Sequence, residues 1–497
     1  MNKQITRVAV VGLVLLASLI VATTYWQTWA AAGLADRQDN AIERVAQFTI
    51  RRGVIYAADG RTVLARNRAR RVGGKTLYFR DYPTRDLFAH VVGYATQVRS
   101  RSGLERSQND FLTGSNENLR TVLDTNLDRL RGATVSGNNL VLTVNARLQR
   151  VATEALRGQC GAAVVLEPRT GRLLAMVSAP GYDPNLIERP GGFGQVASSG
   201  GPCSPAVRLL NRATNGLYIP GSTFKVVTAA AALDLGRYTI KSTFRDPGYC
   251  TEYGRPVYNY SDQGTPAGYG TVNFLQSLQF SINSVFCNVG IALGAQPIID
   301  FSKGLGFYAD PPLETPSGER APSGLYSKDR LYEPERPRDV DPGRFAFGQE
   351  RLLVTPLQMA MVAAAVANGG IVMRPHVVRR VAAPGGTTVT ETRPEALGRA
   401  MEPRTAASLV KMMEAAVQSG TGTAAQLPGI RVAGKTGTAE TGREGRNTTS
   451  FIAFAPVDRP RLAIAVFLEN QDGTGGKTAA PIAKTIMQAL LGSRSNP

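Results

Sequence analysis

The residues best suited to chemistry in this chain are a serine and a lysine three positions apart, Ser222 and Lys225. Residues with this spacing on a helix lie on the same face, so the lysine amine can reach the serine hydroxyl. Pro220 and Gly221 mark a turn into the helix. Ser222 would then lie in the first turn, where free backbone N–H groups favour a developing negative charge. The spacing predicts a nucleophilic serine that is activated by a lysine.

A histidine base is a weaker candidate, because the chain has only two histidines, His90 and His376. The Ser-x-x-Lys spacing is itself common, and it recurs at Ser408 and Lys411. That second copy lies inside an amphipathic helical run with no turn signal before the serine. We therefore interpret Ser408 as an ordinary helix residue, and a catalytic role for Ser222 requires support from other segments.

Two later motifs supply that support. Taken singly, each has an ordinary interpretation as a helix cap or a strand end, but their order after the first motif favours a shared active site. The two motifs are Ser281-Ile282-Asn283 and Lys435-Thr436-Gly437-Thr438.

The proposed base must be uncharged to accept a proton. A free lysine has a pKa near ~10.4, so Lys225 is an effective base at neutral pH only if its pKa lies about 3 lower. That shift corresponds to roughly 4 kcal/mol of differential solvation. Burial in the apolar helix that continues to Leu233, together with a positive charge on Lys435, would lower the pKa in this way.

The remaining motif residues suit the other steps of acyl transfer. Ser281 is placed to relay a proton to a leaving amine, and Asn283 can hold a substrate amide with its paired donor and acceptor. The backbone N–H groups of Ser222 and Thr438 are natural donors to an oxyanion.

The Lys-Thr-Gly-Thr segment is expected to lie at a strand edge. Gly437 would allow the substrate or the helix of the nucleophile to approach the strand backbone closely. We expect Lys435, Thr436 and Thr438 to bind a terminal carboxylate.

The elements that must position these residues indicate an α/β fold of the α+β type. The strands fall in two groups with helices between and after them, which implies one antiparallel five-stranded sheet flanked by helices. The expected strands are 162–166, 173–178, 431–440, 449–455 and 461–469, and the expected final helix is 480–491.

The amino terminus predicts a membrane helix. Residues 8–29 are mostly apolar and carry no charge, which is long enough to span a bilayer. Lys3 and Arg7 favour a cytoplasmic amino terminus, and Trp26 and Trp29 suit the outer interface. A cleaved signal peptide is the alternative, because small residues follow at 30–32. Both interpretations export the rest of the chain.

Three parts are therefore expected along the chain. Residues 1–30 form a cytoplasmic stub and anchor, residues 31–155 a linker and small non-catalytic domain, and residues 156–497 a single catalytic domain.

The net charge of +19 is unevenly distributed. Residues 51–80 hold nine Lys or Arg and one acid, Asp59, which suits either a solvated face or attraction to anionic lipid or wall polymer. No nucleic-acid-binding motif accompanies this charge.

The four cysteines show no zinc-finger spacing, and outside the cell they can pair in three ways. We expect Cys203 to pair with Cys250, since both lie in turn-rich segments, and Cys287 to be a buried free thiol.

Beyond these motifs, much of the chain resembles the class B penicillin-binding proteins. The resemblance includes Arg52-Gly53-Val54-Ile55, residues 161–168, Gly348-Gln349 and Ala367-Asn368-Gly369-Gly370, and it is strongest to the penicillin-binding protein A branch in actinobacteria.

The resemblance implies a membrane-anchored D,D-transpeptidase that cross-links peptidoglycan stem peptides in cell-wall synthesis and is acylated by β-lactams. It implies no metal or organic cofactor and no nucleic acid. A polytopic glycosyltransferase partner would polymerise the glycan. A serine β-lactamase and a β-lactam sensor or scaffold are the alternatives.

Overall fold

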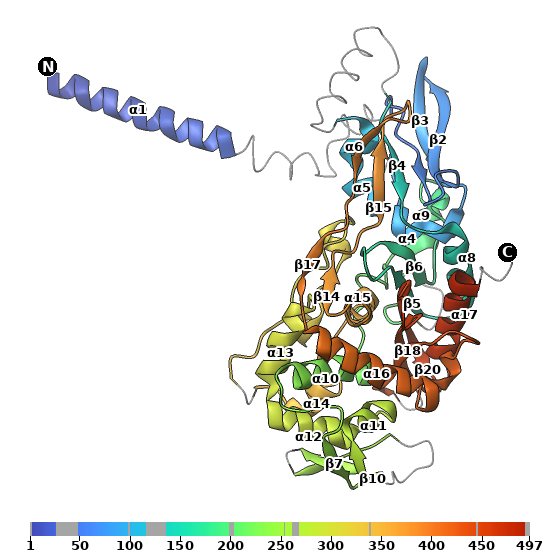
Figure 1. The fold of residues 1–497 in the computed structure, drawn as a ribbon. Coiled ribbons are helices and arrows are strands. Elements are labelled where there is room, and N and C mark those ends of the chain that lie inside the picture. The colour runs from blue at the N-terminus through green and yellow to red at the C-terminus, as the bar shows by residue number, and fades with distance from the viewer. Residues whose placement is uncertain are drawn as a thin grey trace.

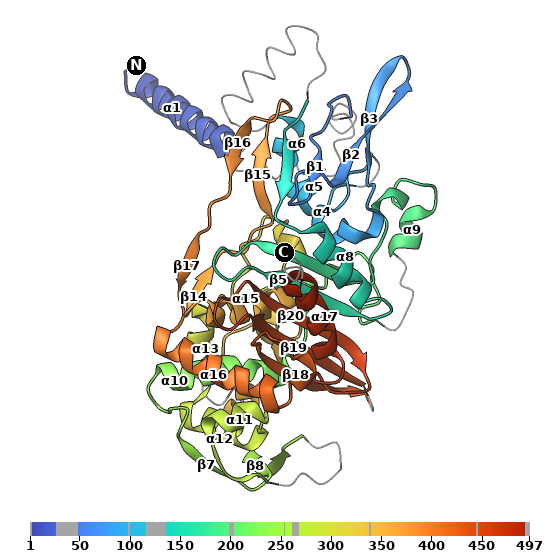
Figure 2. The same ribbon diagram turned by 45° about the vertical axis from the view of Figure 1, so that its right-hand side comes forward.

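The computed structural model describes residues 2–25, 48–97, 100–115, 136–197, 203–252, 254–260, 268–336, 339–443 and 446–492. Figures 1 and 2 show the first strands of the chain, in blue, at one end of the molecule. The central helices and the carboxy-terminal strands and helices, in green to red, form a larger part beneath them.

A five-stranded antiparallel sheet forms the centre of the larger part, as predicted. Its outer strands come from both ends of the domain, so the chain must cross the helical region before the sheet is complete. Across the sheet the order is β18 (Ala433–Arg443), β19 (Arg446–Ala455), β20 (Leu462–Gln471), β5 (Gly161–Leu166) and β6 (Leu173–Ala179).

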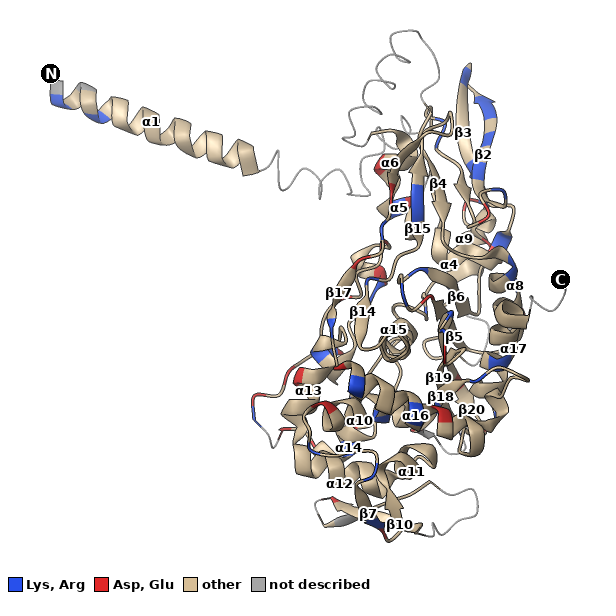
Figure 3. Cartoon of the chain, in the orientation of Figure 1, with Lys and Arg blue, Asp and Glu red and all other residues tan. Residues whose placement is uncertain are grey.

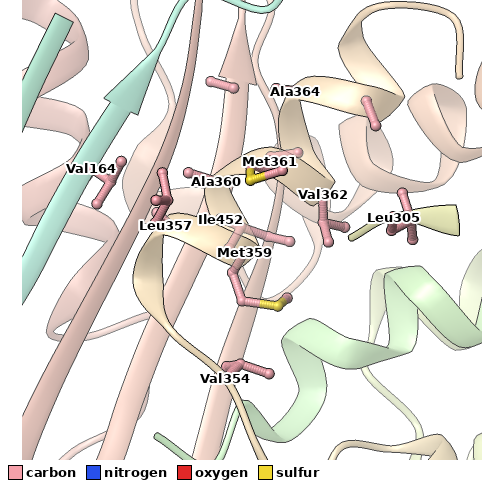
Figure 4. Packing of buried hydrophobic residues seen from close by; sticks show 14 of the residues in the cluster. Val164, Leu305, Val354, Leu357, Met359, Ala360, Met361, Val362, Ala364 and Ile452 are labelled. Atoms are coloured by element: carbon pink, nitrogen blue, oxygen red, sulfur yellow. The ribbon is translucent and has the colours of Figure 1, made fainter. Parts of the chain in front are cut away.

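Helices cover both faces of this sheet. Val164 packs into the core with α15 (Pro356–Ala367), while its neighbour Val165 packs into a second core with α8 (Ala146–Ala155) and α17 (Ala479–Leu491). Successive strand residues point to opposite faces, so a strand covered on both faces is apolar throughout. Figure 4 shows Leu357 and Met359 of α15 beside Val164 and Ile452.

Helices form most of the regular secondary structure between β6 and β18. This part of the chain contributes η3 (Pro184–Leu186), α9 (Gly192–Ala197), η4 (Gly221–Phe224), α10 (Lys225–Asp234), α11 (Phe274–Gln279), α12 (Asn283–Leu293), α13 (Ala295–Gly304), η5 (Ser317–Glu319), α14 (Pro342–Ala346), α16 (Pro403–Ser419) and η7 (Thr423–Ala425).

The same region also contains short strands. Two pairs of them, β7 with β10 and β8 with β9, lie at the end of the molecule opposite the blue strands (Figure 2). The short strands are β7 (Thr243–Asp246), β8 (Tyr249–Glu252), β9 (Arg255–Tyr258), β10 (Gly270–Asn273), β11 (Gly324–Ser327), β12 (Arg330–Leu331), β13 (Leu352–Leu353), β14 (Ile371–Met373) and β17 (Ala396–Arg399).

A six-stranded sheet organises the amino-terminal part. Two of its strands, β15 (Val378–Ala382) and β16 (Thr388–Glu391), come from far along the chain and extend the sheet beyond β4. The other strands are β1 (Ile55–Tyr56), β2 (Val63–Val72), β3 (Lys75–Asp81) and β4 (Asn139–Leu142), and the helices beside them are η2 (Arg85–Phe88), α4 (Ala89–Val92), α5 (Gly103–Ser107) and α6 (Asn109–Thr113).

A buried cluster of charged side chains links segments of this part. The Glu105 carboxylate accepts hydrogen bonds from Arg52 Nη2 (2.9 Å) and Arg80 Nε (2.6 Å), and all three side chains are nearly inaccessible to solvent. Figure 3 shows Lys and Arg along the β2–β3 hairpin. The exposed basic residues of this hairpin include Arg66, Arg68, Arg70, Arg71 and Lys75.

The first helix, α1 (Asn2–Thr24), agrees with the predicted apolar helix. Its segment Thr6–Thr24 is long and apolar enough to cross a membrane. Lys3 lies in its first turn, whereas the predicted interface residues Trp26 and Trp29 lie outside the described residues.

The cysteine pairing differs from the prediction. Cys160 is bonded to Cys203 and Cys250 to Cys287, so neither the Cys203–Cys250 pair nor a free Cys287 exists. A disulfide forms only between segments that the fold brings together. Glu469 connects the first two segments, because its N–H donates to Cys160 O (2.8 Å) and its carboxylate accepts from Ser204 N (2.7 Å). The second bond joins β8 to α12, which pack against each other.

Candidate active site

Ser222 lies where η4 leads into α10, as the turn signal predicted. The Gly221 N–H donates to Gly348 O (3.0 Å), which fixes the backbone directly before the serine. Ser222 is half-buried, while Lys225 is the first residue of α10 and is fully buried. Ser222 is therefore partly accessible to solvent, whereas Lys225, three residues later, is inaccessible.

Two glycines allow β18 to lie directly against η4. A Cβ atom at Gly437 would come within 2.3 Å of Ser450 Oγ and 2.6 Å of Pro220 O. Gly221 has φ +52°, and a Cβ there would lie 2.7 Å from Thr438 O. The close approach predicted for Gly437 is thus present, and its partner is the nucleophile's own helix.

The Lys225 amine is held by the second motif. Nζ lies 2.7 Å from Ser281 O, 2.7 Å from Asn283 Oδ1 and 3.3 Å from Ser281 Oγ. A neutral amine has two N–H groups, and the two acceptors at 2.7 Å can take both. The nitrogen lone pair then remains available for a proton.

Ser281 joins the two lysines. Lys435 Nζ donates to Ser281 Oγ (2.8 Å), so this hydroxyl lies within hydrogen-bonding distance of both amines. Ser281 has φ +59°, a left-handed conformation that a non-glycine residue rarely adopts without support from its surroundings. This conformation occurs at the turn between α11 and α12, where both the carbonyl and the hydroxyl of Ser281 face Lys225.

Both lysines are electrostatically unusual. Burial, and secondarily the charge of Lys435, hold the pKa of Lys225 well below its ordinary value. Burial alone lowers the pKa of Lys435 to about 7. Lys225 Nζ also lies 5.4 Å from the centroid of the Phe286 ring. The direction and both causes predicted for Lys225 are confirmed.

The third motif lies on an edge strand. β18 is hydrogen-bonded to β19 on one side and is the last strand of the sheet. Thr436 Oγ1 lies 2.6 Å from Thr421 Oγ1, and Thr438 Oγ1 accepts from Gly475 N (3.2 Å). Lys435 and Thr436 are buried. The polar side chains of the third motif thus follow one another along the edge strand, two of them buried.

Asn283 makes more hydrogen bonds within the protein than its sequence motif suggested. Oδ1 contacts Lys225 Nζ, and Nδ2 donates to Tyr258 O (3.0 Å). One amide hydrogen is left for a substrate carbonyl. Asn283 thus positions the base in addition to its expected contact with substrate.

The second Ser-x-x-Lys pair is not part of this cluster. The Ser408 hydroxyl donates to Arg404 O (2.9 Å) within α16, and Ser408 is half-buried while Lys411 is exposed. The interpretation of Ser408 as an ordinary helix residue is confirmed.

Three further residues at the site escaped the sequence reasoning. Thr421 contacts Thr436, Tyr258 holds Asn283 through its carbonyl, and Ser450 Oγ donates to Pro220 O (3.3 Å). None lies within a recognisable motif, because each reaches the site through a tertiary contact.

Known proteins with related sequences place this site in context. Residues 161–488 match the penicillin binding protein transpeptidase domain, and residues 52–140 match the penicillin binding protein A dimerisation domain. The chain is 35% identical to the peptidoglycan D,D-transpeptidase PbpA of Mycolicibacterium smegmatis over 99% of both chains. It is 28% identical to the peptidoglycan D,D-transpeptidase MrdA of Escherichia coli, over 83% of this chain and 70% of MrdA.

Solved structures agree with these sequence relationships. The imipenem acyl-enzyme complex of penicillin-binding protein A from Mycobacterium tuberculosis superimposes with a TM-score of 0.78 at 32% identity, over 90% of this chain and 100% of that one. The penicillin G acyl-enzyme complex of the same protein gives a TM-score of 0.78, over 89% of this chain and 100% of that one.

Proposed function

The chain belongs to the class B penicillin-binding proteins, and on this basis we propose that Ser222 is the residue acylated during its reaction. The protein is a serine-type peptidoglycan D,D-transpeptidase of cell-wall synthesis and a β-lactam target. The contacts of Lys225 and Lys435 with Ser281 support the assignment of roles, because they bring an amine with a depressed pKa, a relay hydroxyl and a second amine into one cluster.

In the acylation step, Ser222 Oγ attacks the carbonyl carbon of the D-Ala-D-Ala bond while Lys225 takes the hydroxyl proton. The backbone N–H groups of Ser222 and Thr438 stabilise the oxyanion. The C–N bond then breaks, and D-alanine leaves with a proton relayed by Ser281. Asn283 holds the substrate amide.

The substrate's terminal carboxylate binds beside Lys435, Thr436 and Thr438. The buried ammonium group of Lys435 supplies the charge, and the two hydroxyl groups supply hydrogen bonds. Gly437 allows the strand to lie close to η4, so the carboxylate site and Ser222 keep a fixed position relative to each other.

Transfer completes the cycle. An amine from a neighbouring stem peptide attacks the Ser222 ester, its proton passes to Lys225, and the ester C–O bond breaks. The product is a peptide cross-link, and Ser222 recovers its proton. A β-lactam undergoes only the acylation step. The amine released when its ring amide is cleaved remains covalently tethered to the acyl group.

The lifetime of a labelled penicillin adduct tests this assignment against a serine β-lactamase. We expect a covalent adduct that survives gel filtration and denaturation, because a transpeptidase lacks an efficient deacylating water. The measurement is the decay of protein-bound label after excess penicillin is removed. Rapid multiple turnover with release of hydrolysed penicillin would contradict the transpeptidase assignment. Adduct formation coupled to recruitment of a signalling partner, with no cross-linking of stem peptides, would favour a sensor.

We further propose that residues 1–30 anchor the protein as a single membrane span, with the domain of residues 31–155 and the transpeptidase domain of residues 156–497 outside the cytoplasm. The apolar segment Thr6–Thr24 and the positive charges of Lys3 and Arg7 at its amino-terminal end support this topology. A polytopic membrane glycosyltransferase would supply the glycan strands, and the membrane helix together with the basic β2–β3 hairpin would contact it.

Comparison of the full chain with a form lacking residues 1–30 tests both parts of this proposal. The full chain should fractionate with membranes and recover the glycosyltransferase in a pull-down, whereas the shortened form should lose both properties. Equal recovery of the partner by the two forms would count against a role for the helix in that contact.

A further inference from the structure

Exposed aromatic side chains gather on one small lobe beside the active site. We define the tyrosine lobe as the described residues between 243 and 273, which contain β7–β10. Beyond residue 25, nine large hydrophobic side chains of the described chain are strongly exposed, and four of them are tyrosines of this lobe. They are Tyr249 (43% exposed), Tyr258 (52%), Tyr260 (52%) and Tyr269 (51%). Exposed apolar side chains that are concentrated in one part of a protein are a common feature of binding sites.

The lobe is continuous with the catalytic cluster. The Tyr258 carbonyl accepts from Asn283 Nδ2 (3.0 Å), and the Tyr258 ring lies 6.1 Å from that of Tyr249 across the β8–β9 pair. On the other side, the Tyr269 ring stacks on Phe280 at 5.4 Å, one residue before Ser281. The lobe therefore borders the segment that carries Ser281 and Asn283 on two sides.

A buried hydrogen-bond hub fixes the lobe to the helix that carries Asn283. The Asp246 carboxylate accepts from Ser284 Oγ (2.5 Å), Asn259 Nδ2 (2.9 Å) and the backbone N–H groups of Gly248 and Tyr269 (both 2.8 Å). The Asn259 side chain in turn accepts from Ser284 N (3.0 Å).

The Cys250–Cys287 disulfide adds a covalent link between β8 and α12 directly beneath Tyr249. A surface held in this way loses little conformational freedom on binding.

We propose that the tyrosine lobe binds the glycan strand to which the substrate stem peptide is attached. The proposal rests on the transpeptidase function and adds a second site to it. A pyranose ring presents C–H groups on its faces and hydroxyl groups around its edge. Tyrosine matches both features, because it offers an apolar ring and a polar tip at low entropic cost.

The position of the lobe favours a sugar polymer over a lipid surface. Figures 1 and 2 place β7, β8 and β10 at the end of the molecule opposite the β2–β3 hairpin of the amino-terminal part. The substrate's stem peptide is covalently attached to glycan, so a polymer strand must accompany every peptide that enters the site. Binding it beside Asn283 would retain the enzyme on one strand between reactions.

The test measures binding of peptide-free glycan strands, made by removing the stem peptides with an amidase, to the detergent-solubilised full chain. We expect Tyr249→Ala to weaken this binding by about 5- to 10-fold, the range of one lost stacking contact. Tyr249→Trp should restore it. The KM for cross-linking of intact strands should rise in parallel, with little change in the use of free stem peptides.

Leu397→Ala is the matched control, since Leu397 is also 43% exposed but lies on β17. Equal binding of the parent and Tyr249→Ala to peptide-free glycan would overturn the proposal, as would equal losses on free stem peptides and intact strands. Penicillin labelling of the same samples tests the role of Ser222 separately from glycan binding by the lobe. A chain that binds glycan but takes no label would contradict the function proposed for Ser222 and leave the lobe assignment intact.

Discussion

Replacement of Ser222 by alanine is expected to abolish covalent labelling by penicillin and cross-linking of stem peptides. The substitution removes the only atom that forms the acyl ester in the proposed reaction. The expected loss of rate is on the order of 10⁶-fold, as for removal of the nucleophile in other serine hydrolases. Denaturing gel fluorography with labelled penicillin measures the adduct, and mass spectrometry of the parent protein locates it.

Ser408→Ala provides a matched control, because Ser408 has the same Ser-x-x-Lys context and is also half-buried, but lies on α16 and donates to Arg404 O within that helix. It should label like the parent. Ser222 is only half-buried, so its loss should leave the melting temperature nearly unchanged. A persistent adduct in Ser222→Ala on a different serine would show that the nucleophile has been misassigned.

Replacement of Lys225 by alanine should reduce the acylation rate by about 10²- to 10⁴-fold, the contribution of a positioned general base. The variant would also empty the polar pocket formed by Ser281 O and Asn283 Oδ1. Stopped-flow acylation and thermal unfolding should be measured together. Lys411→Ala is the control for loss of a lysine on an exposed helix face, and it should acylate normally.

The pH dependence of the parent enzyme follows from the same two lysines. Lys225 acts as a base only when neutral, so the acylation rate constant should fall as pH falls through its pKa. Because burial and Lys435 depress that pKa, the rate should persist at neutral pH rather than disappear below about 10.4. The pKa of Lys435 is about 7, and its charge declines above that pH, so affinity for the penicillin carboxylate should weaken there.

These two effects appear in different constants. The acylation constant at saturating penicillin reports Lys225, and the dissociation constant before acylation reports Lys435. An acylation constant that rises only near the ordinary pKa of lysine would contradict a depressed base. An affinity independent of pH above 7 would contradict the role of Lys435 in carboxylate binding.

The sequence was sufficient to predict much of the scaffold and the identity of the catalytic motifs. Apolar runs mark β5, β6, β19 and β20, because side chains that point to buried faces are apolar, whereas β18 was indicated by the Lys-Thr-Gly-Thr motif. The turn residues Pro220 and Gly221 distinguished Ser222 from Ser408, since only the first serine starts a helix. These signals are local, so they can be recognised from neighbouring residues alone.

The tertiary structure decided what depends on contacts between distant segments. It paired Cys160 with Cys203 and Cys250 with Cys287, against the sequence prediction. It also added β15 and β16 to the amino-terminal sheet. Such pairings depend on which surfaces pack together, and spacing along the chain carries little information about that.

The same reason applies to the catalytic base. The sequence identified Lys225 and the condition that it be neutral, but the packing of α10 against α12 and of η4 against β18 created that condition. Complete burial removes water from the amine, and Ser281 brings Lys435 to the same cluster from 210 positions away. Desolvation and charge proximity are properties of the folded state, so only the tertiary structure could establish them.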